Sequence, residues 1–237
     1  MEACGEEAQV KLLGGNISPF VLRVRIALAL KGIDYEFIEE NMQNKSHLLL
    51  QSNPVNKKIP VLIHNGKPVC ESMIIVQYID EAWDTKAPVL MPKDPYDRAI
   101  ARFWAAFVDD KLLPCLRGVF KGQGEQQQKA LEESGASFLL LEEALRTSHC
   151  FSGKPYFGGD EIGFLDIALG GMLAFVKALE KVTNLVLIDQ EKMPLLSTWM
   201  NRFCEADGVK DVMPDPAKLQ EFISAIRVRF TSPPAAN

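Results

Sequence analysis

The sequence has 237 residues, 47% of them hydrophobic, which is enough to bury the core of one large domain or two modest ones. Its formal net charge of −5 argues against nucleic acid or an anionic membrane as the main partner, because phosphate groups are bound by clustered lysines and arginines. No apolar run approaches the roughly 20 residues of a membrane-spanning helix, and the opening segment MEACGEEAQV lacks the pattern of a secretory leader. We therefore expect a soluble cytosolic protein.

Cysteines and histidines are spread along the chain. An odd number of cysteines with no Cys-x-x-Cys pair suits neither a disulfide framework nor a zinc site. We expect buried or idle thiols, no metal and no redox cofactor. The cysteines are Cys4, Cys70, Cys115, Cys150 and Cys204, and the histidines are His47, His64 and His149.

The first third of the chain predicts alternating strands and helices. Ser18-Pro19 is typical of a helix start, because serine is a favoured N-cap and proline fits the first helical position. Asn65-Gly66 between two apolar runs indicates a β-hairpin, and Glu71-Ser72 is expected to cap the helix that follows. In chain order we expect a strand at 10–13, a helix at 21–30, a strand at 35–39, a short helix at 46–51, hairpin strands at 58–63 and 68–70, and a helix at 73–83.

This order predicts a thioredoxin-like α/β domain over residues 1–84, followed by a proline-rich linker at 85–95 and an all-helical domain at 96–237. Pro114 is expected to kink the first long helix, and Asp109 and Asp110 are expected on a solvated face. The tail from about residue 231 is expected to be disordered. The expected helices of this half are 96–120, 125–146, 165–181, 194–206 and 216–229.

Ser18 is the leading candidate for chemistry. It stands between a strand end and a helix start, where unpaired backbone N–H groups and the helix dipole favour a negative charge. A thiolate bound there would accept a hydrogen bond from the serine hydroxyl. The simpler reading is that Ser18 only caps its helix.

Other residues of this domain favour the functional reading. A cis bond before Pro60 would expose the backbone of Ile59 to an extended peptide. Glu71 and Ser72 offer a carboxylate for an amino group, with a hydroxyl and N–H groups for a carboxylate. Lys45 and Lys58 suit a second carboxylate. The set fits a small peptide with one ammonium, two carboxylates and a thiol, which describes glutathione.

Several motifs in order resemble the plant tau class of glutathione S-transferases, over nearly the whole chain. The matching runs are Ser18-Pro19-Phe20 with Arg23-Val24-Arg25-Ile26-Ala27-Leu28, Asn53-Pro54 with Lys57-Lys58-Ile59-Pro60-Val61-Leu62, Glu71-Ser72 with Gln77-Tyr78-Ile79, Phe103-Trp104, and Phe157-Gly158-Gly159-Asp160 through Asp166-Ile167-Ala168-Leu169.

The resemblance implies a transferase of the glutathione S-transferase fold that joins glutathione, as co-substrate, to electrophilic apolar compounds, with Ser18 activating the sulfur. It also implies a homodimer and a possible peroxidase side activity. Ile59 beside cis Pro60 would pair with the cysteinyl part, Glu71 and Ser72 would hold the γ-glutamyl end, and Lys45 with Lys58 the glycine carboxylate. The implied acceptor pocket is Gly15, Asn16, Leu113, Arg117, Phe120 and Phe175.

Some residues depart from the family pattern or allow a second reading. Asn16 and Ile17 replace residues that many relatives have before the serine, so the pocket entrance is expected to differ. Gly163 stands where a capping serine or threonine is frequent, with Asp166 left as a structural cap. Arg117 is either substrate-facing or simply solvated, and Phe120 and Phe175 are either pocket or core residues.

Two other functions fit the same sequence. A carrier that stores apolar ligands or glutathione conjugates needs the cleft but not the reactive serine. Thiol transfer by a catalytic cysteine would need a cysteine at position 18, where the chain has serine.

Overall fold

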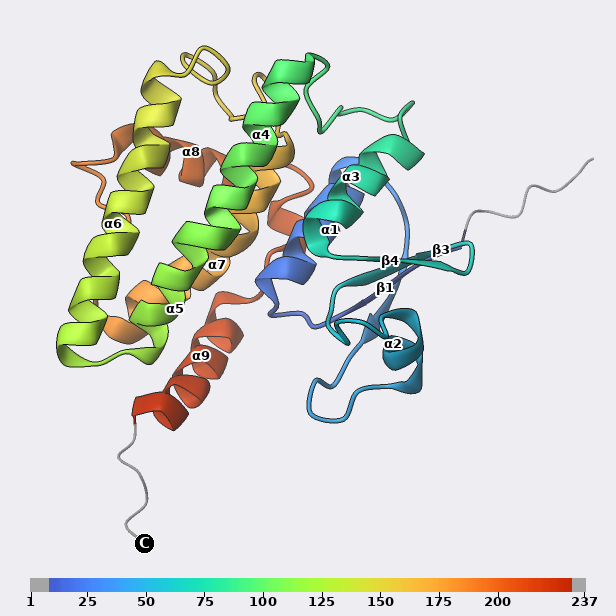
Figure 1. Cartoon of the computed structure of the whole chain (residues 1–237), viewed down its shortest axis with the longest axis horizontal. Coiled ribbons are helices and arrows are strands. Elements are labelled where there is room, and N and C mark those ends of the chain that lie inside the picture. The colour runs from blue at the N-terminus through green and yellow to red at the C-terminus, as the bar shows by residue number, and fades with distance from the viewer. Residues whose placement is uncertain (1–8, 232–237) are drawn as a thin grey trace, which may run out of the picture.

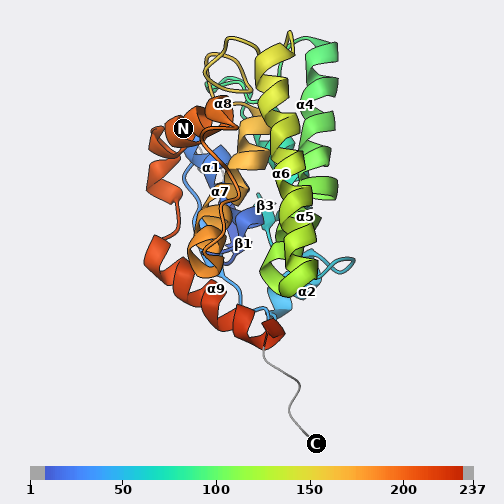
Figure 2. The same ribbon diagram turned by 90° about the vertical axis from the view of Figure 1, so that its left-hand side faces the viewer.

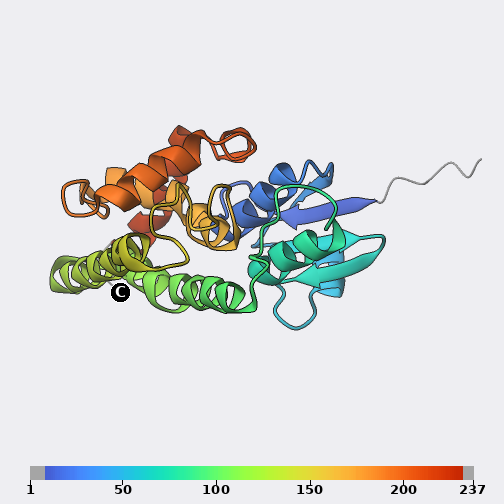
Figure 3. The ribbon, with the colours of Figure 1, turned by 90° about the horizontal axis from the view of Figure 1, so that it is seen from above.

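The structure, a computed structural model, describes residues 9–231 as a small sheet-containing part packed against a larger helical part (Figure 1). Seen from above, the two parts lie side by side (Figure 3). The four-stranded sheet has the order β2-β1-β3-β4, with β2 parallel to β1 and the other pairs antiparallel. Its strands are β1 (Val10–Gly14), β2 (Glu36–Glu39), β3 (Val61–His64) and β4 (Lys67–Cys70).

Helices cover both faces of this sheet. Leu12 and Leu62 point into a core shared with α1 and α3, whereas Leu13 and Val61 pack with Leu49 of α2 on the opposite face. Asn65 and Gly66 both have positive φ, as a tight hairpin turn requires, so the predicted hairpin is confirmed. The predicted order of strands and helices is confirmed as well. The helices are α1 (Pro19–Leu30), α2 (His47–Ser52) and α3 (Ser72–Ala82).

The helical part is a bundle in which α7 is the central helix and α9 packs against α7 and α5 (Figure 2). No helix within residues 9–231 is both long and apolar enough to cross a bilayer. The predicted tail beyond residue 231 lies outside the described residues. The helices are α4 (Pro95–Phe107), α5 (Leu113–Lys121), α6 (Gly124–Thr147), α7 (Phe164–Thr183), α8 (Pro194–Glu205) and α9 (Pro216–Thr231).

The single helix expected over residues 96–120 is interrupted by a π-helical turn, η1 (Val108–Leu112). Pro114, in the first turn of α5, has no N–H to donate, and its ring would clash with the carbonyl four residues earlier in a regular α-helix. The wider turn removes that conflict. Asp109 belongs to this turn and contacts Arg23 of the sheet-containing part.

Arg23 of α1 joins the two parts of the molecule. Its side chain is fully buried, and its guanidinium donates to both carboxylate oxygens of Asp109, at 3.0 and 2.6 Å, and to the backbone oxygen of Ala168 in α7, at 2.9 Å. The expectation that Asp109 lies on a solvated face was therefore wrong. Asp110, its neighbour, is exposed as expected.

Gly171 permits the close approach of α7 to α1 at this junction. A Cβ atom at position 171 would lie 2.5 Å from Cγ of Arg23 and 2.9 Å from the backbone oxygen of Pro19. The second contact is with backbone, which cannot rotate away. Any side chain here would therefore push the two helices apart.

Buried carboxylates fix the ends of two helices of the bundle. Asp166 accepts hydrogen bonds from the N–H groups of Phe157, Gly158 and Gly163 and from the indole of Trp199, so its expected structural capping role is confirmed. Burial raises its pKa to about 6, although these hydrogen bonds oppose the shift.

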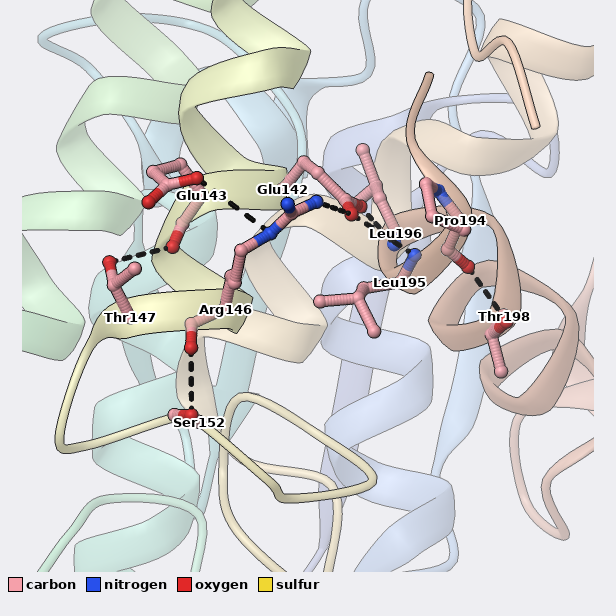
Figure 4. A network of polar contacts seen from close by, with 9 residues as sticks. All are labelled: Glu142, Glu143, Arg146, Thr147, Ser152, Pro194, Leu195, Leu196 and Thr198. Carbon is pink, nitrogen blue, oxygen red and sulfur yellow. Dashed lines mark hydrogen bonds and ion pairs between the residues drawn. The ribbon is translucent and has the colours of Figure 1, made fainter. Parts of the chain in front are cut away.

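Glu142 of α6 plays the same role for α8. It is almost fully buried and accepts from the N–H groups of Leu195 and Leu196, at 3.3 and 2.7 Å, while Arg146 pairs with it at 3.1 Å (Figure 4). Met193, at the N-cap of α8, provides no side-chain hydrogen bond. A neighbouring helix thus supplies the missing cap.

We predict that Asp109→Asn lowers the free energy of unfolding by about 2–3 kcal/mol, because it leaves a buried guanidinium without its counter-charge. The value is below that of a fully enclosed pair, since the Asp109 side chain is 33% exposed. Urea unfolding measures the change. Asp110→Asn is the matched control and should be close to neutral; equal effects of the two variants would contradict this role for Asp109.

Candidate functional site

A cavity of about 880 Å³ lies between the sheet-containing part and the helical bundle. One side comes from the turn after β1, the start of α1 and the segments 39–43 and 58–59, and the other from α5, α7 and α9. Most of its lining is apolar. The predicted residues on it are Gly15, Asn16, Ser18, Lys58, Ile59, Leu113, Arg117, Phe120 and Phe175.

Ser18 sits at the N-cap of α1, on the cavity wall, as its Ser-Pro motif predicts. Its backbone N–H donates to Gly15, and its hydroxyl oxygen accepts from the N–H of Val21 at 3.4 Å, a long bond. That bond uses an oxygen lone pair and leaves the hydroxyl proton available to a ligand. Because the positive end of the helix dipole lies at the same place, the environment favours an anionic ligand atom.

The peptide bond between Ile59 and Pro60 is cis, as expected. Pro60 is buried, whereas Ile59 is half-buried and faces the cavity. Asn53 fixes the preceding turn, since its amide donates to the backbone oxygen of Lys58 at 3.0 Å and its carbonyl oxygen accepts from the N–H of Asn56. Ile59 precedes β3, whose pairing with β1 starts at Val61, so its backbone lies outside that ladder.

Glu71 has an uncommon backbone conformation, with φ of 72° in a non-glycine residue. The expectation that it caps α3 was wrong, because its carboxylate instead accepts from the amide of Asn56 at 2.7 Å. The hydroxyl of Ser72 accepts from Arg23 at 3.3 Å. The first N–H groups of α3 therefore have no side-chain cap, which makes this helix start a candidate site for a carboxylate.

The predicted glutathione residues are only partly brought together. Ser18, Lys58 and Ile59 share the cavity wall, with Lys58 exposed. Outside that lining lie Lys45, Pro60, Glu71 and Ser72.

All the predicted acceptor residues line the cavity. Phe120 and Phe175 make an edge-to-face contact, with ring centroids 5.8 Å apart, and both are half-buried, so they belong to the core as well as the pocket. Leu113 is buried and Arg117 is exposed. Asn16 is held at the entrance by hydrogen bonds to Glu39 and Arg25.

Sequence reasoning missed the outer wall of the cavity, which is α9. Leu219, Phe222, Ile223 and Ile226 recur at intervals of three and four residues, so the available signal was an apolar stripe on an expected helix. Such a stripe predicts that one face of the helix is buried, but it does not identify the part of the protein that covers this face. Segment 41–43 and the side chains of Lys121 and Arg229 were missed as well.

Arg227 fastens α9 to the end of α5. Its guanidinium donates to the backbone oxygens of Val119, at 3.0 Å, of Phe120, and of Gly122, at 3.3 Å. Val119 and Phe120 lie in the last turn of α5 and Gly122 is its C-cap, where no further helical N–H is available to these carbonyls. Desolvation lowers the pKa of Arg227, in keeping with a guanidinium held partly out of water.

The acidic side chains around the cavity already accept hydrogen bonds, whereas three basic side chains line its opposite side. Glu40 is buried and accepts from the hydroxyl and N–H of Ser46, and Glu39 accepts from Asn16. Arg117, Lys121 and Arg229 line the opposite side. Within residues 9–231, the one cluster of three potential metal ligands, Asp97, His149 and Cys150, lies away from this cavity.

Comparison with known proteins matches both parts of the chain to one family. Residues 8–81 match the family model of the glutathione S-transferase N-terminal domain, and residues 96–207 that of its C-terminal domain. Glutathione S-transferase U17 of Arabidopsis thaliana is 52% identical over 92% of this chain and 96% of its own length.

Solved structures of glutathione S-transferases are similar to this chain along most of its length. A tau class glutathione S-transferase from mango has a TM-score of 0.86 and 50% identity, over 92% of this chain and 98% of its own. Rice GST1, solved in complex with glutathione, has a TM-score of 0.86 and 38% identity, over 95% of this chain and 99% of its own.

We predict that Arg227→Ala loosens α9, because the variant leaves the last carbonyls of α5 without charged donors, each such bond contributing about 1.5–3 kcal/mol. Hydrogen exchange should speed up in residues 216–231, and an apolar fluorescent probe should bind the cavity roughly tenfold more weakly. Arg202→Ala is the control, since Arg202 donates to the backbone oxygen of Pro155, away from the cavity. Unchanged exchange in α9 would contradict the fastening role.

Proposed function

This chain belongs to the tau class of glutathione S-transferases, and on that premise we propose that it joins the thiolate of glutathione to apolar electrophiles, with Ser18 as its catalytic residue. The observation that carries the proposal is the position of Ser18, at a helix N-terminus on the wall of a mostly apolar cavity. No resident cofactor is required, because glutathione itself supplies the nucleophile.

Glutathione binding along the sheet-containing side would use both ends of the peptide. The exposed Lys58 and the half-buried Lys45 would attract the glycine carboxylate with their ammonium groups. The backbone of Ile59 is available to the cysteinyl residue. The uncapped start of α3 suits the γ-glutamyl carboxylate, and the carboxylate of Glu71 suits its ammonium group.

The Ser18 hydroxyl would then lower the pKa of the bound thiol. It donates to the sulfur, and the start of α1 adds a favourable local field. A free thiol has a pKa of about 8.5, and each unit of lowering corresponds to about 1.4 kcal/mol in favour of the anion. Lowering by about two units ionises most of the bound sulfur at neutral pH.

The cavity would collect the acceptor beside this thiolate, so that proximity supplies much of the rate enhancement. Phe120, Phe175 and the apolar stripe of α9 suit an aromatic or aliphatic body. Arg117, Lys121 and Arg229 would favour acceptors that carry an anionic group at the end remote from the reacting atom.

Reduction of organic hydroperoxides is the proposed side activity of the same thiolate. The sulfur would attack the terminal peroxide oxygen and release the alcohol. A second glutathione would then displace water from the oxidised sulfur and leave the glutathione disulfide. The protein supplies only the activated first thiolate.

The cytosol remains the proposed location. The thiols of Cys70, Cys115, Cys150 and Cys204 are free, which suits a reducing compartment. Nucleic acid and membranes remain outside the proposed partners, as the net charge of −5 favours neither.

Ser18→Ala should lower kcat for conjugation of a model aromatic halide by roughly 100-fold, the scale for loss of one donor to a reacting anion. The thiolate absorbance that appears when glutathione binds near neutral pH should disappear, whereas glutathione affinity should change little. The same variant loses a helix cap, so unfolding must be measured alongside, with an expected loss of about 1 kcal/mol or less.

Ser18→Thr is the matched control, because it keeps a hydroxyl at the N-cap and should retain much of the activity. Unchanged turnover in Ser18→Ala would remove Ser18 from its proposed role. Apolar ligand binding without any conjugation by the unmodified protein would favour the carrier function.

The proposed homodimer is supported by apolar side chains that remain exposed on neighbouring helices. Phe103 of α4 and Leu139 and Leu140 of α6 are between 45% and 61% exposed. Light scattering should give twice the chain mass, and Phe103→Glu should shift the mass toward the monomer. Val186→Glu, at a still more exposed valine between α7 and α8, should leave the mass unchanged. A monomer at micromolar concentration contradicts the proposal.

A further inference from the structure

Three potential metal ligands meet near the start of α4 and the end of α6. Asp97 belongs to the first turn of α4, and His149 and Cys150 belong to the loop that follows α6. The thiol of Cys150 lies 3.2 Å from Oδ1 of Asp97 and 3.5 Å from Nε2 of His149, and that nitrogen lies 3.8 Å from the same Asp97 oxygen. Each of the three potential ligand atoms thus lies within 3.8 Å of the other two.

These separations, from 3.2 to 3.8 Å, bracket the edge lengths of one face of a tetrahedron around a bound ion. A tetrahedral Zn²⁺ with bonds of about 2.0–2.3 Å to sulfur, nitrogen and oxygen holds those atoms about 3.3–3.6 Å apart. The side chains of Asp97 and Cys150 are half-buried and that of His149 is exposed, so small rotations suffice to adjust the triangle. We propose that Asp97, His149 and Cys150 bind one Zn²⁺, with water as the fourth ligand.

The donor types support zinc over other common cations. Thiolate and imidazole are poor ligands for Mg²⁺ and Ca²⁺, which prefer oxygen, whereas a mixed sulfur, nitrogen and oxygen set is usual for Zn²⁺. Three protein ligands leave one tetrahedral position open for water.

The surrounding structure holds the three ligands in place. Phe151 is buried in the bundle core immediately after Cys150, and its N–H donates to the backbone oxygen of Ser148. The ring of Tyr96 lies against the imidazole of His149, with centroids 5.5 Å apart. A bound ion would therefore join the start of α4 to the loop after α6, two segments separated by about 50 residues.

Binding should release the thiol proton to solvent. Cysteine binds Zn²⁺ as the thiolate, so the thiol of Cys150 must lose its proton when the ion binds. Because protons and Zn²⁺ compete for the sulfur, affinity should rise as pH rises.

The experiment is a titration of the metal-free full chain, in its solution assembly, with Zn²⁺ and with Co²⁺ as a spectroscopic probe. We expect one equivalent of Zn²⁺ per chain and a thiolate-to-cobalt absorption band. Cys150→Ala and His149→Asn should each weaken binding by about 100-fold or more, since even loss of an outer hydrogen-bond partner costs 10- to 100-fold. Circular dichroism confirms that each variant is folded.

Cys115→Ala and His47→Asn are the matched controls, because both residues lie outside the cluster, and they should bind Zn²⁺ as the unmodified chain does. Zn²⁺ should also slow alkylation of Cys150 but not of Cys115. Absence of saturable binding, or binding that persists in Cys150→Ala, overturns the proposal and leaves a thiol that is merely hydrogen-bonded to Asp97.

Discussion

The buried guanidinium of Arg23 is the constraint on which the arrangement of the two parts depends. It neutralises Asp109 from the π turn, binds the backbone of α7 and reaches the hydroxyl of Ser72 at the start of α3. One side chain thus ties the sheet-containing part, the bundle and a proposed ligand site together. Because the charge is fully enclosed, the alternative to this geometry is an unpaired buried ion, which makes other domain orientations costly.

The cavity follows from that orientation. Ser18 is the N-cap of the helix that carries Arg23, so fixing α1 against α7 also fixes the distance from the serine to Phe175 and to the wall formed by α9. The close approach at Gly171 sets how far apart the helices stand. The proposed reactive end of the site, at Ser18, and its apolar end are therefore positioned by one contact, without a direct bond between them.

Sequence patterns that span only a few residues predicted most of the fold. Asn65-Gly66, Ser18-Pro19 and the apolar periodicities each act over a few residues, and the elements they predict are present. Relations between distant residues were harder. Asp109 was misplaced because its partner lies 86 residues away, and Glu71 because its carboxylate binds Asn56 instead of its own helix. The cluster of Asp97 with His149 and Cys150 was missed for the same reason, since spacing along the chain carries no trace of it.

The bond between Arg227 and α5 has an evolutionary implication. The guanidinium holds main-chain oxygens, so this contact itself does not depend on the identities of the side chains on α5. Substitutions on the inner faces of these two helices can then reshape the space offered to the second substrate, while the first helix and its serine stay as they are. A gene family that duplicates such a scaffold can diversify in what it accepts at little risk to how it activates sulfur.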